Sequence, residues 1–380
     1  MGQKIGDNLR GLSAPVHASV SGRVRVIGDV DTADGRKGTA ITITNDGQDT
    51  LDETITPHPE WEQATPEEIR GLIRESGIVG MGGAGFPTHA KLQVPPDKKL
   101  NLLLVNGAEC EPYLTCDHRL FLEATELIIL GIKVLMRVAA VEQAYIGAKV
   151  TMEGVQDALW PFLEKEKGID LVLLESKFPQ GEERQLIYAV TGKEIPSGGL
   201  PWDLGVLVVN VSTVWAVGML VTSGYPSFQR GVTVSGAVQQ PSNYMVRVGT
   251  PISALLEAAG GFAGEPGAII LGGPMTGLPQ SSTLVPITKQ NNGVTVFAKG
   301  TVAGGGTTDC IRCGRCVAAC PYRLLPLYLA KEAERGDIEQ LNKFNLLDCR
   351  ECACCAYSCP AHIPLLHWMR LGKGQLRAAR

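Results

Sequence analysis

The spacing of apolar residues changes along the chain and predicts several segments with different folds. Near the N-terminus, apolar and polar side chains alternate from Ala14 to Val26 and again from Ala40 to Thr44, with a turn signal at Asp34-Gly35 between them. A period of two is typical of β-strands that have one face against a core. We therefore expect an N-terminal β-module over residues 1–56.

Helical and strand patterns alternate in the next segment, residues 60–225. Thr65, Pro66 and Glu68 supply an N-cap, a first-turn proline and a capping box, and they predict a helix that runs to about residue 76. An apolar strand is expected over residues 100–105. The apolar run over residues 204–221 contains polar side chains and is better explained by a buried strand that leads into a helix than by a membrane span. This alternation predicts an α/β domain.

Two smaller units are expected to complete the chain. Residues 228–280 contain short strand patterns around one helix over residues 251–259, as in a β-grasp domain. Gly304-Gly305-Gly306-Thr307 reads as a linker, and residues 300–380 form a cysteine-rich domain. The predicted fold class is a multi-domain α/β protein in which a β-module, an α/β core, a β-grasp unit and a small helical domain follow one another.

Composition and charge narrow the class of protein. The chain has 380 residues, of which 44% are hydrophobic and 19% charged, and this excludes a mainly disordered protein. A net charge of −4 gives no electrostatic footprint for nucleic acid. Residues 301–380 nevertheless carry a net charge of +4 and residues 1–300 a net charge of −8. Such a basic unit can dock on an acidic partner, although a solvated surface is the commoner explanation.

The start of the chain carries no apolar segment behind a basic stretch, so no secretory signal is expected. Gln3-Lys4-Ile5-Gly6 resembles the middle of a β-domain, and we expect that N-terminal residues are missing from this sequence.

The cysteines form two runs near the C-terminus. Nine of the 11 cysteines lie between Cys310 and Cys359, and without a secretory context such a group indicates metal binding. Each run has the C-x2-C-x2-C-x3-C-P spacing of bacterial ferredoxins, which hold two [4Fe–4S] clusters. Structural zinc sites use two separated cysteine pairs instead. In the ferredoxin pattern one cluster is bound by Cys310, Cys313, Cys316 and Cys359, and the other by Cys349, Cys352, Cys355 and Cys320.

Three further cysteines fall outside this spacing. Cys354 is expected to be a packing residue. Cys110 lies between two carboxylates that raise the pKa of a thiol, and neither it nor Cys116 is a candidate nucleophile.

A glycine-rich loop follows the first helix of the α/β segment. Gly80, Gly82 and Gly85 match G-x-G-x-x-G, but a helix precedes the loop where a dinucleotide-binding fold has a strand. An ordinary Rossmann site is therefore disfavoured. Closely spaced glycines still let backbone N–H groups crowd around a phosphate or a flat ring, and Lys91 adds a positive charge. A purely structural turn is the alternative.

Polar residues also follow the apolar strands. Asn106, Glu109 and Glu111 come directly after the strand at 100–105, and Asn210 and Thr213 follow a second apolar strand. A third polar stretch covers residues 178–183. The carboxyl ends of parallel strands are where α/β proteins bind ligands, although acidic loop residues are often simply solvated.

Taken together, these segments resemble a known family. Residues 80–92, 106–113 and 196–201, with residues 14–22, 272–275 and both cysteine runs, are similar to the C subunits of ion-translocating ferredoxin:NAD oxidoreductase (Rnf) complexes. The α/β core is more distantly similar to the flavin-bearing, NADH-binding subunit of respiratory complex I. The resemblance covers nearly the whole chain and includes a barrel-sandwich module at the N-terminus and an SLBB-like β-grasp unit.

The resemblance implies a noncovalently bound FMN, NAD(H) as substrate and two [4Fe–4S] clusters. It places the following residues at cofactor-contacting positions: Gly80, Gly82, Gly83, Gly85, Lys91, Asn106, Glu109, Gly181, Glu182, Glu183, Asn210 and Thr213. It also implies the other subunits of a membrane-bound complex and a ferredoxin-like carrier as partners, with the chain held peripherally at the cytoplasmic face of the membrane. No residue is assigned to acid–base catalysis.

The sequence departs from the related patterns at several positions. Met81, Ala108 and Phe178 stand where the complex I subunit has arginine, aspartate and tyrosine. These differences weaken the assignment of NADH-contacting residues by resemblance more than that of flavin-contacting residues. The N-terminal Gly-Gly-Ile-His-Pro segment of the family is also missing.

Flavin chemistry explains this combination of sites, because a flavin converts between a two-electron hydride donor and one-electron carriers. The expected function is an NADH-linked oxidoreductase subunit. One alternative is a corrin reductase, which shares the glycine-rich loop and the cluster domain but usually lacks the N-terminal module. Another is a non-enzymatic iron–sulfur relay or scaffold, which would bind no flavin.

Overall fold

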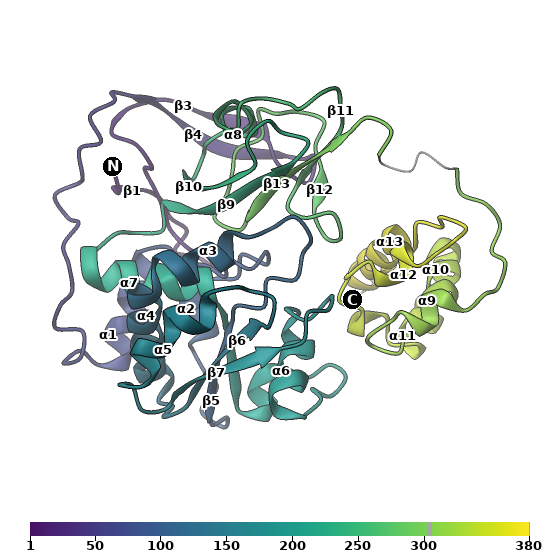
Figure 1. Ribbon diagram of the computed structural model, residues 1–380, viewed down its shortest axis with the longest axis horizontal. Coiled ribbons are helices and arrows are strands. Elements are labelled where there is room, and N and C mark those ends of the chain that lie inside the picture. The colour runs from purple at the N-terminus through teal and green to yellow at the C-terminus, as the bar shows by residue number, and fades with distance from the viewer. Residues whose placement is uncertain (302–305, 380) are drawn as a thin grey trace.

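The computed structural model describes residues 1–301 and 306–379 and contains the expected succession of β-module, α/β domain, β-grasp domain and helical domain (Figure 1). In the described residues no helix is both long enough and apolar enough to cross a bilayer. The predicted linker residues Gly304 and Gly305 lie outside the described residues.

The N-terminal module consists of two small antiparallel sheets. Strands β1 (Lys4–Gly6) and β2 (Val16–His17) form one, and the long ribbon of β3 (Gly22–Asp31) and β4 (Lys37–Asn45) forms the other. The alternating run from Ala14 to Val26 is therefore not one strand. Gly22 begins the second part with φ of 141°, and a Cβ at this position would lie 2.0 Å from the carbonyl oxygen of Thr44.

The α/β domain is built on a parallel four-stranded sheet with the order β7-β6-β5-β8. Its strands are β5 (Leu102–Asn106), β6 (Ala144–Lys149), β7 (Ile169–Leu174) and β8 (Val206–Asn210). Its helices are α1 (Pro66–Glu75), α2 (Thr88–Lys91), α3 (Cys116–Glu123), α4 (Thr125–Ala139), α5 (Val155–Leu163), α6 (Glu183–Thr191), η1 (Pro201–Leu204) and α7 (Val211–Ser223). The predicted capping box at Thr65 and Glu68 is confirmed.

Helices cover both faces of this sheet. Helices α4 and α7 contribute to the large core on one face, whereas Leu186 and Ile187 of α6 pack on the other. Glycines allow the backbones of α4 and α7 to approach closely, since a Cβ on Gly131 would lie 2.1 Å from the carbonyl oxygen of Val214. The predicted strand-to-helix run over residues 204–221 is confirmed as β8 followed by α7.

The β-grasp domain has a five-stranded sheet with the order β10-β9-β13-β11-β12. Its elements are β9 (Gln229–Gly236), β10 (Ser242–Arg247), α8 (Ile252–Ala258), β11 (Pro266–Leu271), β12 (Leu278–Pro279) and β13 (Gly293–Ala298). The sheet extends beyond the expected range of 228–280, because β13 pairs in parallel with β9 and lies in the middle of the sheet.

The C-terminal domain is helical. It contains α9 (Arg315–Ala318), α10 (Pro326–Arg335), α11 (Ile338–Lys343), η2 (Leu346–Asp348), α12 (Cys354–Tyr357) and α13 (Leu365–Ala378). Leu329 of α10 and Met369 of α13 belong to its small core. The domain lies beside the α/β domain on the side of α6 (Figure 1).

Candidate functional site: a glycine-lined cleft beside two cysteine pockets

A cleft opens at the carboxyl ends of β5 and β8. Its volume is about 650 Å³, which lies within the usual range for small-molecule sites. Nine of the residues predicted from the sequence line it, and they come from five separate segments: Gly80, Gly82, Lys91, Asn106, Gly181, Glu182, Glu183, Asn210 and Thr213. The cleft is also lined by Phe86, Leu200 and Trp202, which give it apolar walls.

The glycine-rich loop is a tight turn whose backbone is fixed by hydrogen bonds to buried side chains packed against it. The N–H of Gly80 donates to the carbonyl oxygen of Phe86 at 2.8 Å and closes the turn. The N–H of Met81 donates to Thr213 Oγ1 at 2.9 Å, and the fully buried Arg230 donates through Nη1 to the carbonyl oxygen of Met81 at 3.0 Å. These contacts fix the backbone of the loop where it borders the cleft.

Helix α7 begins at the floor of the cleft. Asn210 is its N-cap, and Asn210 Oδ1 accepts a hydrogen bond from the N–H of Ser212 at 2.9 Å. The buried Asp117 holds this helix start, because it accepts from Asn210 Nδ2 at 2.9 Å and from Ser212 Oγ at 2.6 Å. The N-terminus of a 13-residue helix, with its free N–H groups and positive dipole end, suits an anion such as phosphate.

Acidic residues and one lysine form the opposite wall. Glu182 is the N-cap of α6 and accepts hydrogen bonds from the backbone N–H groups of Arg184 and Gln185. Lys91 Nζ lies 2.7 Å from Glu183 Oε1. The lysine that the sequence assigned to a phosphate is therefore already paired with the Glu183 carboxylate.

Asn106 and Gly181 fit together at the same wall. Asn106 Nδ2 donates to the carbonyl oxygen of Gly181 at 2.7 Å. A Cβ on Gly181 would lie 2.3 Å from the carbonyl oxygen of Ala108. Only glycine therefore allows the two loops to meet here.

Three of the predicted residues do not line the cleft. Gly83 and Gly85 belong to the outer part of the glycine-rich loop, where both have positive φ. Glu109 points into the interior and accepts hydrogen bonds from the N–H groups of Asp117 and His118 at the start of α3, each at 3.2 Å. Burial, together with the neighbouring Asp117 carboxylate, raises the pKa of Glu109 to about 7.

The other residues of that loop have structural roles. Glu111 accepts the N–H groups of Met275 and Thr276, at 3.1 and 2.7 Å, and so ties the α/β domain to the β-grasp domain. Burial raises the pKa of the Cys110 thiol to about 11, with Glu111 adding to the rise. Neither this thiol nor the buried Cys116 is an activated nucleophile.

The eight cysteines of the two runs line two separate pockets. Cys310, Cys313, Cys316 and Cys359 line one, which we call the first-run pocket. Cys320, Cys349, Cys352 and Cys355 line the other, the second-run pocket. This is the exchange of the fourth cysteine that the ferredoxin spacing predicts. Cys354, expected to be a packing residue, also lines the second-run pocket.

The second-run pocket lies beside the cleft. Arg350 lines both, and its Nε lies 3.7 Å from Glu182 Oε1. The hydroxyl of Tyr322, which also lines the second-run pocket, donates a hydrogen bond to Glu182 Oε2. Nearby, Ser197 of the α/β domain donates to Asp348 of the helical domain.

Sequence reasoning did not find four residues that build this region. Arg230 bonds to the glycine-rich loop and Asp117 to the start of α7. Tyr322 and Arg350 connect the cleft to the second-run pocket. Tyr322 and Arg350 each lie within two residues of a cluster cysteine, which is the only signal that the sequence offers. Nothing in the sequence marks Arg230 or Asp117 as part of the site, because Asp117 is 93 residues from Asn210 and Arg230 is 149 residues from Met81 along the chain.

The residues present fit the expected groups. A flavin mononucleotide needs an anion site and a flat, crowded surface for its ring. The start of α7 supplies the first, and Gly80 and Gly82, which line the cleft without side chains, supply the second. Each cysteine pocket holds its four predicted ligand cysteines, the donor set of a [4Fe–4S] cluster, and the second-run pocket holds Cys354 in addition.

Four family models match successive parts of the chain. The RnfC barrel sandwich hybrid domain matches residues 1–48, the Nuo51 FMN-binding domain residues 73–219, the SLBB domain residues 232–279 and the 4Fe-4S dicluster domain residues 309–363. These matches confirm the predicted fold class and the two kinds of cofactor.

Curated relatives match over the whole chain. The chain is 39% identical to the C subunit of the Na(+)-translocating ferredoxin:NAD(+) oxidoreductase complex of Acetobacterium woodii, covering 100% of this chain and 86% of the relative. It is 42% identical to the proton-translocating counterpart of Clostridium ljungdahlii, again over 100% of this chain, and covers 83% of that relative. It is 40% identical to the C subunit of the ion-translocating oxidoreductase complex of Rhodobacter capsulatus, over 99% of this chain and 73% of the relative.

Solved structures share the fold. An NAD+-reducing [NiFe]-hydrogenase in the H2-reduced state matches 85% of this chain with a TM-score of 0.58 and 21% identity. The match covers 65% of the hydrogenase chain, which is less than two thirds of it.

Proposed function

The chain belongs to the family of C subunits of ion-translocating ferredoxin:NAD(+) oxidoreductase complexes, and we propose that it transfers electrons between NADH and its two [4Fe–4S] clusters through FMN. It works in this proposal as a peripheral subunit at the cytoplasmic face of the membrane, beside other subunits that carry ion transport. The relatives' names differ in the ion, sodium in one and proton in another. The proposal therefore concerns electron transfer alone.

One observation carries this proposal: Arg350 lines both the second-run pocket and the glycine-lined cleft, so the two sites are adjacent. When bound, FMN accepts a hydride from NADH and gives up its electrons one at a time. The start of α7 would hold its phosphate, and the glycine-rich loop and Gly181 would border its ring. Since tunnelling rates fall steeply with distance, a cluster beside the cleft is well placed to exchange those electrons.

The placement of the cysteines orders the two clusters. The second-run site adjoins the cleft, and the first-run pocket shares no lining residue with the cleft in the described parts of the chain. The second-run site is therefore the inner electron carrier and the first-run site the outer one. Glu182, which caps α6 and contacts both Tyr322 and Arg350, holds the inner site against the cleft.

The test is an equilibrium titration of the chain, purified without oxygen and reconstituted with iron, sulfide and FMN. We expect one FMN and two clusters per chain, and NADH should bleach both the flavin band and the iron–sulfur shoulder. A chain that takes up both clusters but no FMN would be an iron–sulfur relay, and the proposed function would be wrong.

A further inference from the structure

A pair of carboxyl groups lies next to the start of α7, outside the cleft. Glu109, Cys116 and Asp117 come together there, with the carboxylate oxygens and the thiol within 4.8 Å of one another. Cys116 and Asp117 are buried, and Glu109 is partly buried. Glu109 Oε1 accepts hydrogen bonds from Cys116 Sγ at 3.5 Å and from the N–H of Asp117 at 3.2 Å. Two carboxylates this close repel each other, and one shared proton relieves the repulsion.

Hydrogen bonds join this carboxyl pair to the anion site. Asp117 accepts from Asn210 Nδ2 at 2.9 Å and from Ser212 Oγ at 2.6 Å, and both donors belong to the start of α7. Asn210 also lines the cleft. A phosphate dianion held at this helix start therefore adds negative charge next to Asp117, and through it next to Glu109.

Arg230 supplies the positive charge beside the pair. It is fully buried, it approaches from β9, and its charge acts on both Asp117 and Glu109. Its Nη2 has no hydrogen-bond partner within residues 1–301 and 306–379. When Glu109 carries a proton, Arg230 and Asp117 balance each other. When it does not, the group has a net negative charge.

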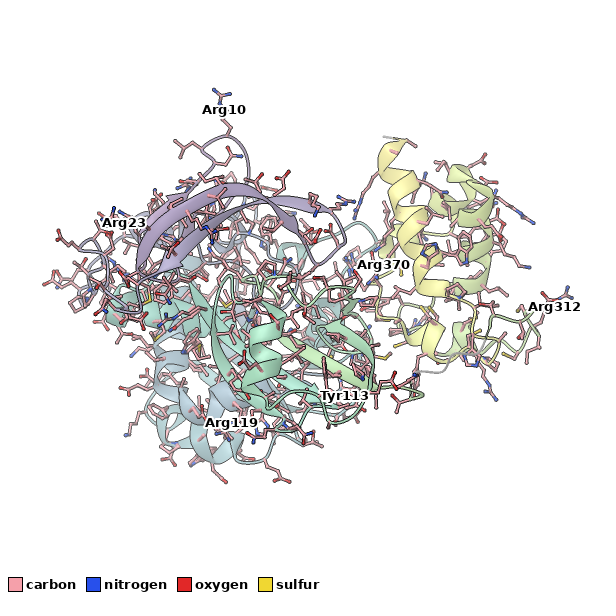
Figure 2. The ribbon with its side chains drawn as sticks, turned by 90° about the horizontal axis from the view of Figure 1, so that it is seen from above. Arg10, Arg23, Tyr113, Arg119, Arg312 and Arg370 are labelled. Atoms are coloured by element: carbon pink, nitrogen blue, oxygen red, sulfur yellow. The ribbon has the colours of Figure 1, made fainter. Side chains whose placement is uncertain are left out.

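The other charged or titratable side chains near Glu109 are turned away from it. His118 Nε2 donates to a backbone carbonyl oxygen at 2.8 Å, Glu111 is bonded to the β-grasp domain, and the Cys110 thiol accepts from a backbone N–H. Figure 2 shows Arg119, further along α3, at the outer surface, where it forms an ion pair. Glu109 is therefore the group whose charge responds to the anion site.

We propose that Glu109 takes up a proton from the solvent when the phosphate of FMN binds at the start of α7. The inference rests on the proposed function, because it requires FMN at this place. The Glu109 carboxylate becomes a carboxylic acid, the proton comes from water, and no electron moves. The proton offsets part of the negative charge that the phosphate brings, so FMN binds more tightly where the proton is available.

The linkage acts near neutral pH. Burial and Asp117 already raise the pKa of Glu109 to about 7 in the FMN-free chain. Added negative charge at α7 raises that pKa further, so FMN affinity falls as the pH rises above 7. We expect the Kd for FMN to increase about fivefold from pH 7 to pH 9, and binding at pH 7.5 to take up about half a proton. The phosphate itself titrates at about pH 6, outside this range.

The test uses the full chain with both clusters reconstituted and FMN removed. Calorimetric titration at pH 7.5 in two buffers of different ionisation enthalpy counts the protons, and quenching of flavin fluorescence gives Kd from pH 7 to pH 9. Riboflavin, which lacks the phosphate, is the matched ligand and should bind without proton uptake.

Two variants identify the group that holds the proton. Glu109→Gln keeps hydrogen-bond acceptors and should abolish both the proton uptake and the dependence of Kd on pH. Glu153→Gln changes an exposed carboxylate and should retain both.

The outcomes separate this inference from the proposed function. FMN that binds without proton uptake, equal uptake with riboflavin, or uptake that persists in Glu109→Gln would overturn the inference and leave the proposed function standing. The comparison of FMN with riboflavin needs only the unmodified chain and does not depend on how a variant folds. A chain that does not bind FMN at any pH would overturn both.

Discussion

Tyr322 connects the two cofactor regions through a single hydrogen bond. Its hydroxyl donates to Glu182 Oε2 in the cleft, and Tyr322 also lines the second-run pocket. A hydrogen bond to a charged group contributes about 1.5–3 kcal/mol, so its loss should weaken the contact between the two domains.

We predict that Tyr322→Phe slows reduction of the clusters about tenfold and leaves reduction of the flavin by NADH unchanged. Stopped-flow absorbance at flavin and cluster wavelengths separates the two rates. Tyr328→Phe is the matched control, because Tyr328 bonds to Gln340 within the helical domain. If both variants behave like the unmodified chain, the contact between Tyr322 and Glu182 has no role in electron transfer.

Glu109 is a buried carboxyl group whose pKa is raised to about 7 by burial and by Asp117. Because the folded state holds this proton more tightly than the unfolded state, Glu109 contributes most to stability below its ordinary pKa of 4.5. That contribution is lost as the pH rises from there through about 7.

We therefore predict a protonated carboxyl band in the infrared spectrum at pH 6 that disappears with a midpoint near pH 7. Glu109→Gln should remove the band. Glu68→Gln should retain it, because the hydrogen bonds of the capping box lower the pKa of Glu68. A band that survives Glu109→Gln would show that another group holds the proton.

Several residues predicted from the sequence lie together in the structure. The ferredoxin spacing groups the eight cysteines as the two pockets do: the first three of each run lie in one local loop, and the fourth lines the pocket of the other run. Nine of the twelve expected flavin-site residues line the cleft. Glu109 does not, because its carboxylate caps the start of α3, and that contact depends on how the loop folds back.

At the scale of single elements, the start of α7 determines the anion site. Asn210 caps this helix and lines the cleft, so its side chain serves both the helix and the ligand. Loss of an N-cap costs about 1 kcal/mol of stability.

We predict that Asn210→Ala weakens FMN binding about tenfold, because an uncapped first turn frays and loses the arrangement of its free N–H groups. Quenching of FMN fluorescence by the apo chain measures the affinity. Asp337→Ala removes the N-cap of α11 in the helical domain, at a similar cost in stability, and should leave FMN affinity unchanged. Equal FMN affinity in both variants would contradict the anion site at α7.

Local signals also explain which elements are predictable. The capping box at Thr65 places the start of α1 correctly. The break between β2 and β3 is not expected from the sequence, because alternation continues across Gly22 and only the close approach of Thr44 reveals it. Strand β13 is not predicted from the sequence, because its place beside β9 depends on pairing between residues about 60 positions apart.

At the scale of the whole molecule, Lys289 joins three parts of the chain. Its Nζ donates to the carbonyl oxygens of Pro15 in the N-terminal module and Gly77 in the α/β domain, at 2.7 and 2.6 Å. Burial lowers the pKa of this lysine to about 8. Its loss leaves two carbonyl oxygens without these donors.

We predict that Lys289→Met destabilises the chain by about 2 kcal/mol and exposes the N-terminal module to proteolysis. Thermal unfolding and limited digestion measure the two effects. Lys299→Met is the control, because Lys299 forms an exposed pair with Glu265 and such pairs contribute less than about 1 kcal/mol. A similar loss in both variants would mean that Lys289 does not hold the domains together.

The order of domains follows from hydrophobic patterning and motifs, whereas their arrangement does not. Periodicity and the cysteine runs predict the α/β, β-grasp and helical domains because each of these three folds around its own core. The contacts that bring the inner cluster site to the cleft join Glu182 to Tyr322 and Arg350, which lie 140 and 168 positions further along the sequence. No local pattern encodes such contacts.

The most direct measurement of the central claim is single-turnover stopped-flow absorbance of the reconstituted chain mixed with NADH, compared with a Cys352→Ala/Cys355→Ala variant that lacks the inner cluster. In the unmodified chain the flavin should bleach first and both clusters should follow. In the variant the flavin should still bleach, and the outer cluster should stay oxidised on the same timescale. Reduction of the outer cluster at the normal rate in that variant would contradict the order of cofactors that the structure assigns.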